Sequence, residues 1–415
     1  MLEALGNTDT AMIGSYRKAY LKRLQRAGVG ETDIASDFHV PEVTANNFFR
    51  YPYLAVSGTL VDSIAVYDSK YKLSKLNIFV NDIPLGGKNG IDLKSLQSSI
   101  VRYPISLPLS VGYNKIDISA TNEKGAESRK ETHYFAYSPK EKPASKTYFI
   151  GIGVDKYKDS AMNLKYAEKD IKDLSLLFSW KSEDVQVVTL LNERVTRDNV
   201  LALKKMLLQT SIHDKVIISL SGHGILSDNK EFYFATHDIS FDNPAKNGIL
   251  YEDLEGLLDN IPARQKLLMI DACHSGEVDG TETAMPATTI IADTIKLTAN
   301  TRSSIKNVRP KVGLKNSLDL MKELFSDLST GNGTVVISAA GGYEYALEDG
   351  KYSNGVFTYC IKKGLLENAA EKDGQAGISV SELREYVTKE VERLTSGRQK
   401  PTSRKEILYA DWNVW

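Results

Sequence analysis

The second half of the chain alternates short apolar runs with stretches of helical periodicity. We interpret as strands the apolar runs 147–153, 185–191, 215–220, 231–235, 266–270 and 334–339. Apolar residues recur at helical spacing in 167–178, 196–208, 254–258, 318–328, 356–366 and 380–394. Strands that alternate with helices predict an α/β fold, with a mostly parallel sheet and helices on both of its faces.

The stretch 46–137 has a different pattern, in which short β-rich segments are separated by turn clusters. The segments are 53–56, 75–80, 99–107, 114–119 and 132–136. The turns include Asn81-Asp82 and Gly86-Gly87. We interpret this stretch as a small β-sandwich of immunoglobulin type, although it lacks the Cys…Trp…Cys pattern of an antibody domain.

Polar residues and two prolines at 138–146 predict a linker. Residues 1–45 contain a short amphipathic helix, whose basic residues we interpret as a solvated face rather than a nucleic-acid site. The predicted organisation is therefore a helical or linker segment at 1–45, a β-sandwich at 46–137, a linker at 138–146 and an α/β domain at 147–415.

The composition narrows the environment and the partners of the protein. A net charge of −1 over 415 residues gives no overall attraction to nucleic acid or to an anionic membrane. Two cysteines, Cys273 and Cys360, do not make a disulfide framework and suit a reducing compartment. We see no secretory leader and no apolar stretch of membrane-spanning length, and therefore expect a cytoplasmic protein.

Two strands of the predicted sheet end in residues that carry chemistry. The run 266–270 leads into Asp271 and Cys273, and the run 215–220 leads into Ser221-Gly222-His223-Gly224. Ligands bind beyond the carboxyl ends of strands in such sheets, so both side chains are expected to face one crevice. A nearby imidazole activates a thiol whose ordinary pKa is about 8.5.

A single cysteine is more often a buried core residue than a nucleophile, and this is our interpretation of Cys360, inside the apolar helix 356–366. For Cys273 the pairing with His223 favours catalysis. His274 is a weaker candidate for the base, because an extended backbone points it away from its neighbour Cys273.

The motifs Ser221-Gly222-His223-Gly224 and Asp271-Ala272-Cys273-His274-Ser275-Gly276, with the helix start at 163–170, resemble those of caspase-like cysteine peptidases. Metacaspases and bacterial caspase homologues are the most similar members. Caspases also place the histidine about 50 residues before the cysteine, as here. The β-rich region resembles the segment that links a WD-repeat propeller to a caspase domain in some bacterial proteins.

The resemblance implies a role for each matching residue. Cys273 corresponds to the nucleophile and His223 to the general acid–base. The backbone N–H groups of Gly224 and Cys273 would form the oxyanion hole. No third catalytic residue is assigned.

In metacaspases an acidic pocket selects the residue before the cleaved bond. The matching positions here are Asp170, Ser221 and Asp271. Two carboxylates favour a cation, so the expected partner is a protein or peptide substrate with Arg or Lys before the cleaved bond. The alternative for Asp170 is an ordinary carboxylate in the first turn of a helix.

The irregular stretch 277–316 matches the caspase linker that is cut on activation. Its lysines and arginines make self-cleavage a hypothesis. No cofactor is expected to be required. Some relatives need calcium, and although no EF-hand loop is visible, Asp228, Asp238 and Asp242 leave a calcium site open.

Two other classes of function were weighed against a cysteine endopeptidase. A catalytically silent adaptor with a caspase-like fold is the main alternative, and the retained Cys–His pair argues against it. A nucleotide-binding domain is disfavoured, because no Gly-rich phosphate loop follows the first strand.

Overall fold

The computed structural model describes residues 17, 20–21, 39–45, 47–87, 89–227, 231–272, 274–275, 300–301, 332–339, 347–349, 352–404 and 411–415. Of the predicted elements, the helix at 318–328 lies outside these residues, and so does nearly all of the stretch 277–316. Within the described part of the chain, no helix combines the length and the apolar character needed to span a membrane.

A six-stranded sheet forms the centre of the second half of the chain, in the order β11-β10-β12-β16-β19-β22. The strands are β10 (Thr147–Gly153), β11 (Val185–Leu191), β12 (Lys215–Ser221), β16 (Gln265–Asp271), β19 (Thr334–Ser338) and β22 (Thr402–Arg404). The first five are parallel, and β22 pairs antiparallel with β19 at one edge. The predicted mostly parallel sheet is confirmed.

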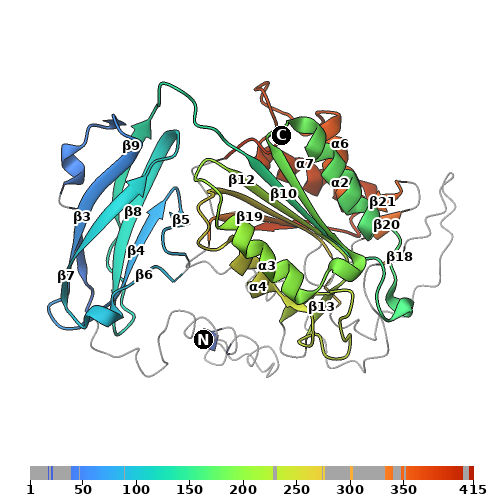
Figure 1. Cartoon of the computed structure of the whole chain (residues 1–415), viewed down its shortest axis with the longest axis horizontal. Coiled ribbons are helices and arrows are strands. Elements are labelled where there is room, and N and C mark those ends of the chain that lie inside the picture. The colour runs from blue at the N-terminus through green and yellow to red at the C-terminus, as the bar shows by residue number, and fades with distance from the viewer. Residues whose placement is uncertain are drawn as a thin grey trace.

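Helices cover both faces of this sheet (Figure 1). The helices α3 (Arg197–Leu207) and α4 (Tyr251–Leu258) lie on one face. The helices α2 (Ala167–Lys181), α6 (Val356–Leu366) and α7 (Val380–Leu394) lie on the other. Successive strand residues face opposite sides: Ile150 and Ile152 join the core beneath α3 and α4, whereas Phe149 joins the core beneath α2 and α6. Both faces are therefore buried, which explains the continuous apolar runs.

Side-chain caps fix the starts of two helices. Thr196 caps α3 by accepting a hydrogen bond from the backbone N–H of Asn199 at 3.2 Å. Ser379 and Glu382 form a reciprocal capping box at the start of α7.

Two small sheets lie beyond the main one. The first contains β13 (Gly224–Leu226), β14 (Phe232–Phe234), β15 (Ile249–Leu250) and β17 (His274–Ser275). The second contains β18 (Asn300–Thr301), β20 (Leu347–Asp349) and β21 (Asn354–Gly355). Because β13 follows β12 and β17 follows β16, the first small sheet extends the carboxyl edge of the main sheet, where the candidate residues lie.

The N-terminal β-region (residues 42–137) is built from two sheets around one core. One sheet contains β1 (Glu42–Ala45), β3 (Thr59–Tyr67) and β7 (Ile100–Pro108). The other contains β2 (Leu54–Ala55), β4 (Leu73–Val80), β5 (Ile83–Pro84), β6 (Ile91–Asp92), β8 (Gly112–Asn122) and β9 (Glu131–Tyr137). The predicted fold class, an α/β sheet preceded by a β-rich region, is confirmed, and the exact domain boundaries stay a prediction.

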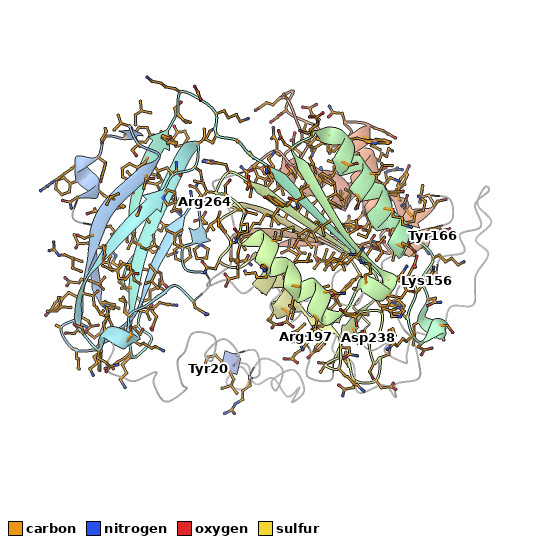
Figure 2. All side chains as sticks on the ribbon, in the orientation of Figure 1. Tyr20, Lys156, Tyr166, Arg197, Asp238 and Arg264 are labelled. Carbon is orange, nitrogen blue, oxygen red and sulfur yellow. The ribbon has the colours of Figure 1, made fainter. Side chains whose placement is uncertain are left out.

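The N-terminal β-region meets the α/β part at the amino ends of the parallel strands. Arg264, just before β16, donates hydrogen bonds to Ser110 Oγ at 2.8 Å and to the carbonyl oxygen of Pro108 at 2.6 Å. Figure 2 labels Arg264 where the two parts meet. This contact is at the opposite end of the sheet from His223.

Candidate active site

His223 is buried two residues beyond the end of β12, with 3% of its surface exposed. Its backbone N–H donates to the hydroxyl oxygen of Tyr157 at 3.0 Å, and that hydroxyl donates to the carbonyl of Val154 at 3.1 Å. The imidazole packs against two aromatic rings, with centroid distances of 5.1 Å to Tyr157 and 5.8 Å to Phe241, and these two rings also contact each other at 5.6 Å. Packing against these two rings restricts the rotation of the imidazole.

The imidazole makes a directional contact with the backbone of Met162, at the end of a 3-10 turn (Ser160–Met162). Its Nε2 atom lies 2.8 Å from the Met162 carbonyl oxygen. A carbonyl only accepts, so Nε2 carries the proton in this contact, and in the neutral ring Nδ1 is then the basic nitrogen. This partner of His223 could not be predicted, because a backbone carbonyl has no signature in the sequence.

The register of the strands aligns the two candidate motifs. Ser221 and Asp271 are partners in the parallel β12–β16 pair, and Gly224 and His274 are partners in the β13–β17 pair. The backbone N–H of Gly222 also donates to the carbonyl of Asp271 at 3.2 Å. Cys273 itself lies outside the described residues. Its predicted roles, as nucleophile and as part of the oxyanion hole, stay predictions, as does that of Gly224.

Asp170, in the first turn of α2, is completely buried. Its Oδ2 atom accepts a hydrogen bond from Ser221 Oγ at 3.0 Å. Its Oδ1 atom accepts from Asn354 Nδ2 at 2.9 Å and from the backbone N–H of Gly355 at 3.0 Å. One carboxylate thus connects α2, the end of β12 and the strand β21.

Asp271, at the end of β16, is 2% exposed. Its Oδ2 atom accepts a hydrogen bond from Thr358 Oγ1, on α6, at 2.8 Å. Because Ser221 is bonded to Asp170 and in register with Asp271, the three predicted pocket residues come together at the carboxyl ends of β12 and β16. Asn354 and Thr358 were not predicted from the sequence, because no local motif marks them.

Cys360 lies in α6 and has no exposed surface. Burial raises the pKa of its thiol to about 12. A thiol in this state stays protonated and unreactive near neutral pH, as expected for a core residue.

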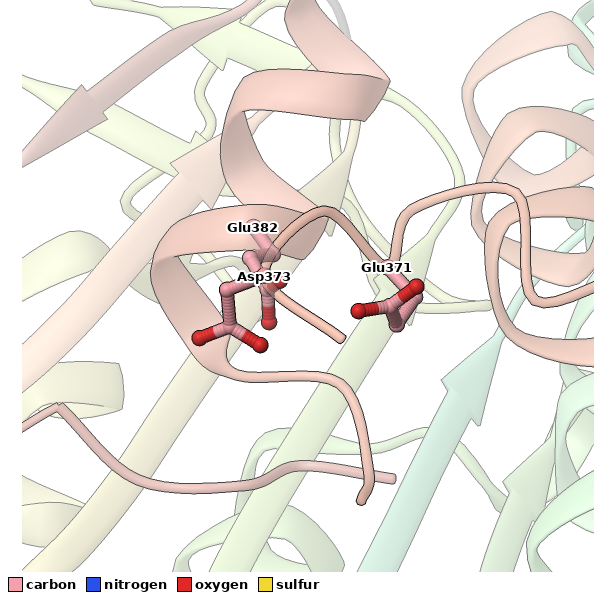
Figure 3. A group of neighbouring side chains, drawn as sticks. All are labelled: Glu371, Asp373 and Glu382. Atoms are coloured by element: carbon pink, nitrogen blue, oxygen red, sulfur yellow. The ribbon is translucent and has the colours of Figure 1, made fainter. Parts of the chain in front are cut away.

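Among the described residues, one group of carboxylates is close enough to suggest a metal site: Glu371, Asp373 and Glu382 (Figure 3). Backbone N–H groups already donate hydrogen bonds to carboxylates of this group. Glu382 accepts from the N–H groups of Ser379 at 2.8 Å and of Lys372 at 2.9 Å. The group is therefore explained by the turn that begins α7, and exposed acidic groups of this kind are common without an ion.

Of the carboxylates that left a calcium site open in the sequence, the two that the structure describes, Asp238 and Asp242, belong to no such group. Asp238 accepts from Thr236 Oγ1 at 3.1 Å and from Asn247 Nδ2 at 2.9 Å, which ties its two oxygens to its own loop. Asp228 lies outside the described residues. Dependence on calcium stays untested by the structure.

Comparisons with known proteins bear on the α/β part of the chain. A family model described as a caspase domain matches residues 150–410. The crystal structure of protein GSU0716 from Geobacter sulfurreducens is similar to 62% of this chain and 92% of that chain, at 18% identity and a TM-score of 0.41. No curated protein matches the chain.

Proposed function

The chain belongs to the caspase-domain family of C14 peptidases, and from this membership we propose that it is a cysteine endopeptidase with a Cys273–His223 dyad. The observation that carries the proposal is the contact between His223 Nε2 and the carbonyl of Met162. It leaves Nδ1 as the base, on an imidazole buried at the edge where β12 and β16 end. Protein or peptide substrates follow from the family.

In the proposed reaction, the thiol of Cys273 transfers its proton to Nδ1 of His223, and the thiolate attacks the carbonyl carbon of the scissile bond. The backbone N–H groups of Gly224 and Cys273 would stabilise the oxyanion. The imidazolium then protonates the leaving amine, and an acyl-thioester remains on Cys273. Water, deprotonated by the same imidazole, hydrolyses the thioester and restores the free thiol.

We propose further that the residue before the cleaved bond is Arg or Lys. Asp170 and Asp271 are buried carboxylates near Ser221, and a buried negative charge favours a cationic side chain. A guanidinium is well suited, because its planar donors match the oxygens of carboxylates and hydroxyls. The negative charge of the pocket, rather than its shape, would then select the substrate side chain.

Peptide reporters that end in Arg, Lys, Asp or Leu test activity and preference together. Turnover of the Arg and Lys reporters is expected, and it should disappear in Cys273→Ala and in His223→Ala. His237→Ala is a matched control, because the side chain of His237 bonds only to the carbonyl of Lys156 among the contacts described, at 2.7 Å. Failure to turn over any reporter would support the silent adaptor instead.

The hypothesis of self-cleavage within 277–316 follows from the same specificity, since this stretch contains several lysines and arginines. Fragments should appear in the intact protein during incubation and should be absent in Cys273→Ala. Identical bands in the two samples would contradict self-processing while leaving the activity on peptides unaffected.

A further inference from the structure

A pocket of about 610 Å³ lies between the N-terminal β-region and the amino ends of the parallel strands. From the β-region it is lined by Asn81, Ile83, Ser110, Val111 and Tyr113. From the α/β part, Thr147, Val185, Lys215 and Gln265 are the first residues of four parallel strands that reach it. Pockets of roughly 300–1,000 Å³ at domain interfaces are typical sites for small molecules.

Four cationic side chains from separate segments converge on this pocket. They are Lys142 before β10, Lys181 at the end of α2, Lys215 at the start of β12 and Arg264 before β16. The carboxylate side chains among the described lining residues are Asp184 and Asp411. No described carboxylate forms an ion pair within 4.0 Å of any of the four cations.

Neutral groups hold three of these cations in place. Lys215 Nζ donates to the carbonyl oxygen of Asn413 at 2.6 Å. Lys181 Nζ lies 4.4 Å from the centre of the Trp415 ring, which attracts a cation through its electron-rich face. Arg264 is 6% exposed and bonds to the β-region through a hydroxyl and a carbonyl. These three positive charges are thus oriented by neutral groups, without an ion pair to a described carboxylate.

The surroundings of the pocket lower the pKa values of Lys215 and Arg264. Burial lowers the pKa of Lys215, and the neighbouring charges of Lys142 and Lys181 lower it further. Burial lowers the pKa of Arg264 to about 10. Like charges gathered in a partly buried site disfavour one another, and a bound anion would remove that cost.

We propose that this pocket binds a small phosphorylated molecule. Phosphate oxygens are strong acceptors with more than one negative charge, and lysine is a common phosphate ligand. The volume suits one small molecule rather than a folded partner. The ligand would contact both parts of the chain at once, at the end of the sheet opposite to the proposed catalytic dyad, so it would not compete with a peptide substrate.

Titration calorimetry on the full chain, with inorganic tripolyphosphate and separately with ATP, tests the proposal. Saturable binding of one ligand per chain is expected for at least one probe. Lys142→Gln and Lys181→Gln should each weaken it about tenfold or more, the effect of losing one hydrogen bond between charged groups. Both side chains are exposed, so the variants are expected to fold. Lys124→Gln, at an exposed turn of the β-region, is the matched control.

Tripolyphosphate and ATP binding equally would place recognition on the phosphates, whereas preference for ATP would add contacts to its base and sugar. Absence of saturable binding by either probe would overturn the proposal. Equal weakening by Lys124→Gln, or binding of a long single-stranded oligonucleotide alone, would overturn it as well, because either result indicates diffuse surface charge. The readout is binding, so its failure is independent of any failure of the proposed peptidase activity.

Discussion

The buried carboxylate of Asp170 makes the sharpest test of the proposed preference for Arg and Lys, because its charge and its structural role can be separated. Three donors depend on it: Ser221 Oγ, Asn354 Nδ2 and the N–H of Gly355. Each buried donor left without an acceptor costs about 1–3 kcal/mol. Asp170→Ala would therefore remove about 3–9 kcal/mol, which is much of the stability of an ordinary domain.

Asp170→Asn retains the volume and one oxygen. That oxygen can accept from Asn354 and Gly355, while the new amide can donate to the hydroxyl of Ser221. We expect a stability loss of no more than about 1–2 kcal/mol, whereas the negative charge disappears entirely. Losing about 1.5–3 kcal/mol of interaction with a substrate cation lowers kcat/KM for Arg and Lys reporters by about 10- to 150-fold.

Reporter kinetics and thermal unfolding together decide the outcome. Asp173→Asn is the matched control: it lies one turn further along α2 and also accepts from Asn354, at 3.1 Å, but Lys169 and Lys362 neutralise it. It should leave the preference for Arg and Lys unchanged. If Asp170→Asn folds and keeps that preference, the carboxylate serves only the fold, and the charge argument for specificity is refuted.

Four further predictions follow from individual contacts. Iodoacetamide should modify only Cys273 in the native protein, because burial raises the pKa of Cys360 to about 12, and mass spectrometry should find native Cys273→Ala unmodified. Gly333→Ala should destabilise the protein more than Gly374→Ala in urea unfolding. Both backbones have positive φ, at +75° and +73°, but only at Gly333 would the new Cβ meet another side chain, that of Ile83, at 2.5 Å. Equal losses of unfolding free energy would mean that the two parts of the chain do not pack there. Burial alone would raise the pKa of Asp173, but hydrogen bonds from Lys169, Lys362 and Asn354 outweigh it and lower the pKa. The ionised Asp173 carboxylate therefore stabilises the fold above pH about 4, and this stabilisation is lost as the pH falls further. The difference in unfolding free energy between the protein and Asp173→Asn should narrow between pH 6 and pH 3. Turnover of Arg reporters should persist in EDTA, and its loss with recovery on adding calcium would instead establish a calcium requirement.

The sequence predicted the main sheet well because its strands are buried on both faces and read as unbroken apolar runs. The strands β10 (Thr147–Gly153) and β11 (Val185–Leu191) and the helices α6 and α7 have the predicted bounds. The strand β3 (Thr59–Tyr67) was not predicted, because Asp62 and Ser63 interrupt its apolar run. Asp62 is buried because it accepts hydrogen bonds from Asn47, a tertiary contact that no local pattern shows.

Part of the candidate site could likewise be predicted from the sequence, and part could not. The rule that ligands bind at the carboxyl ends of strands, with the family motifs, led to His223, Ser221 and Asp271 as candidates. The partners of the carboxylates could not be chosen, because Asn354 is 184 positions from Asp170 and Thr358 is 87 positions from Asp271. Only the folded chain brings these donors to the site.

The orienting contact of His223 has a consequence for how this protein tolerates mutation. Its acceptor is a peptide carbonyl, which every amino acid at position 162 supplies. Substitution of Met162 leaves the carbonyl acceptor in place, so an alanine scan would not detect this contact. Sensitivity moves instead to the side chains that shape the turn: Asp159, which accepts from the N–H of Ala161 at 3.1 Å, and Asn163, which accepts from that of Tyr157 at 2.8 Å. Changes in the orientation of the histidine are therefore expected from substitutions at Asp159 and Asn163, which shape this turn.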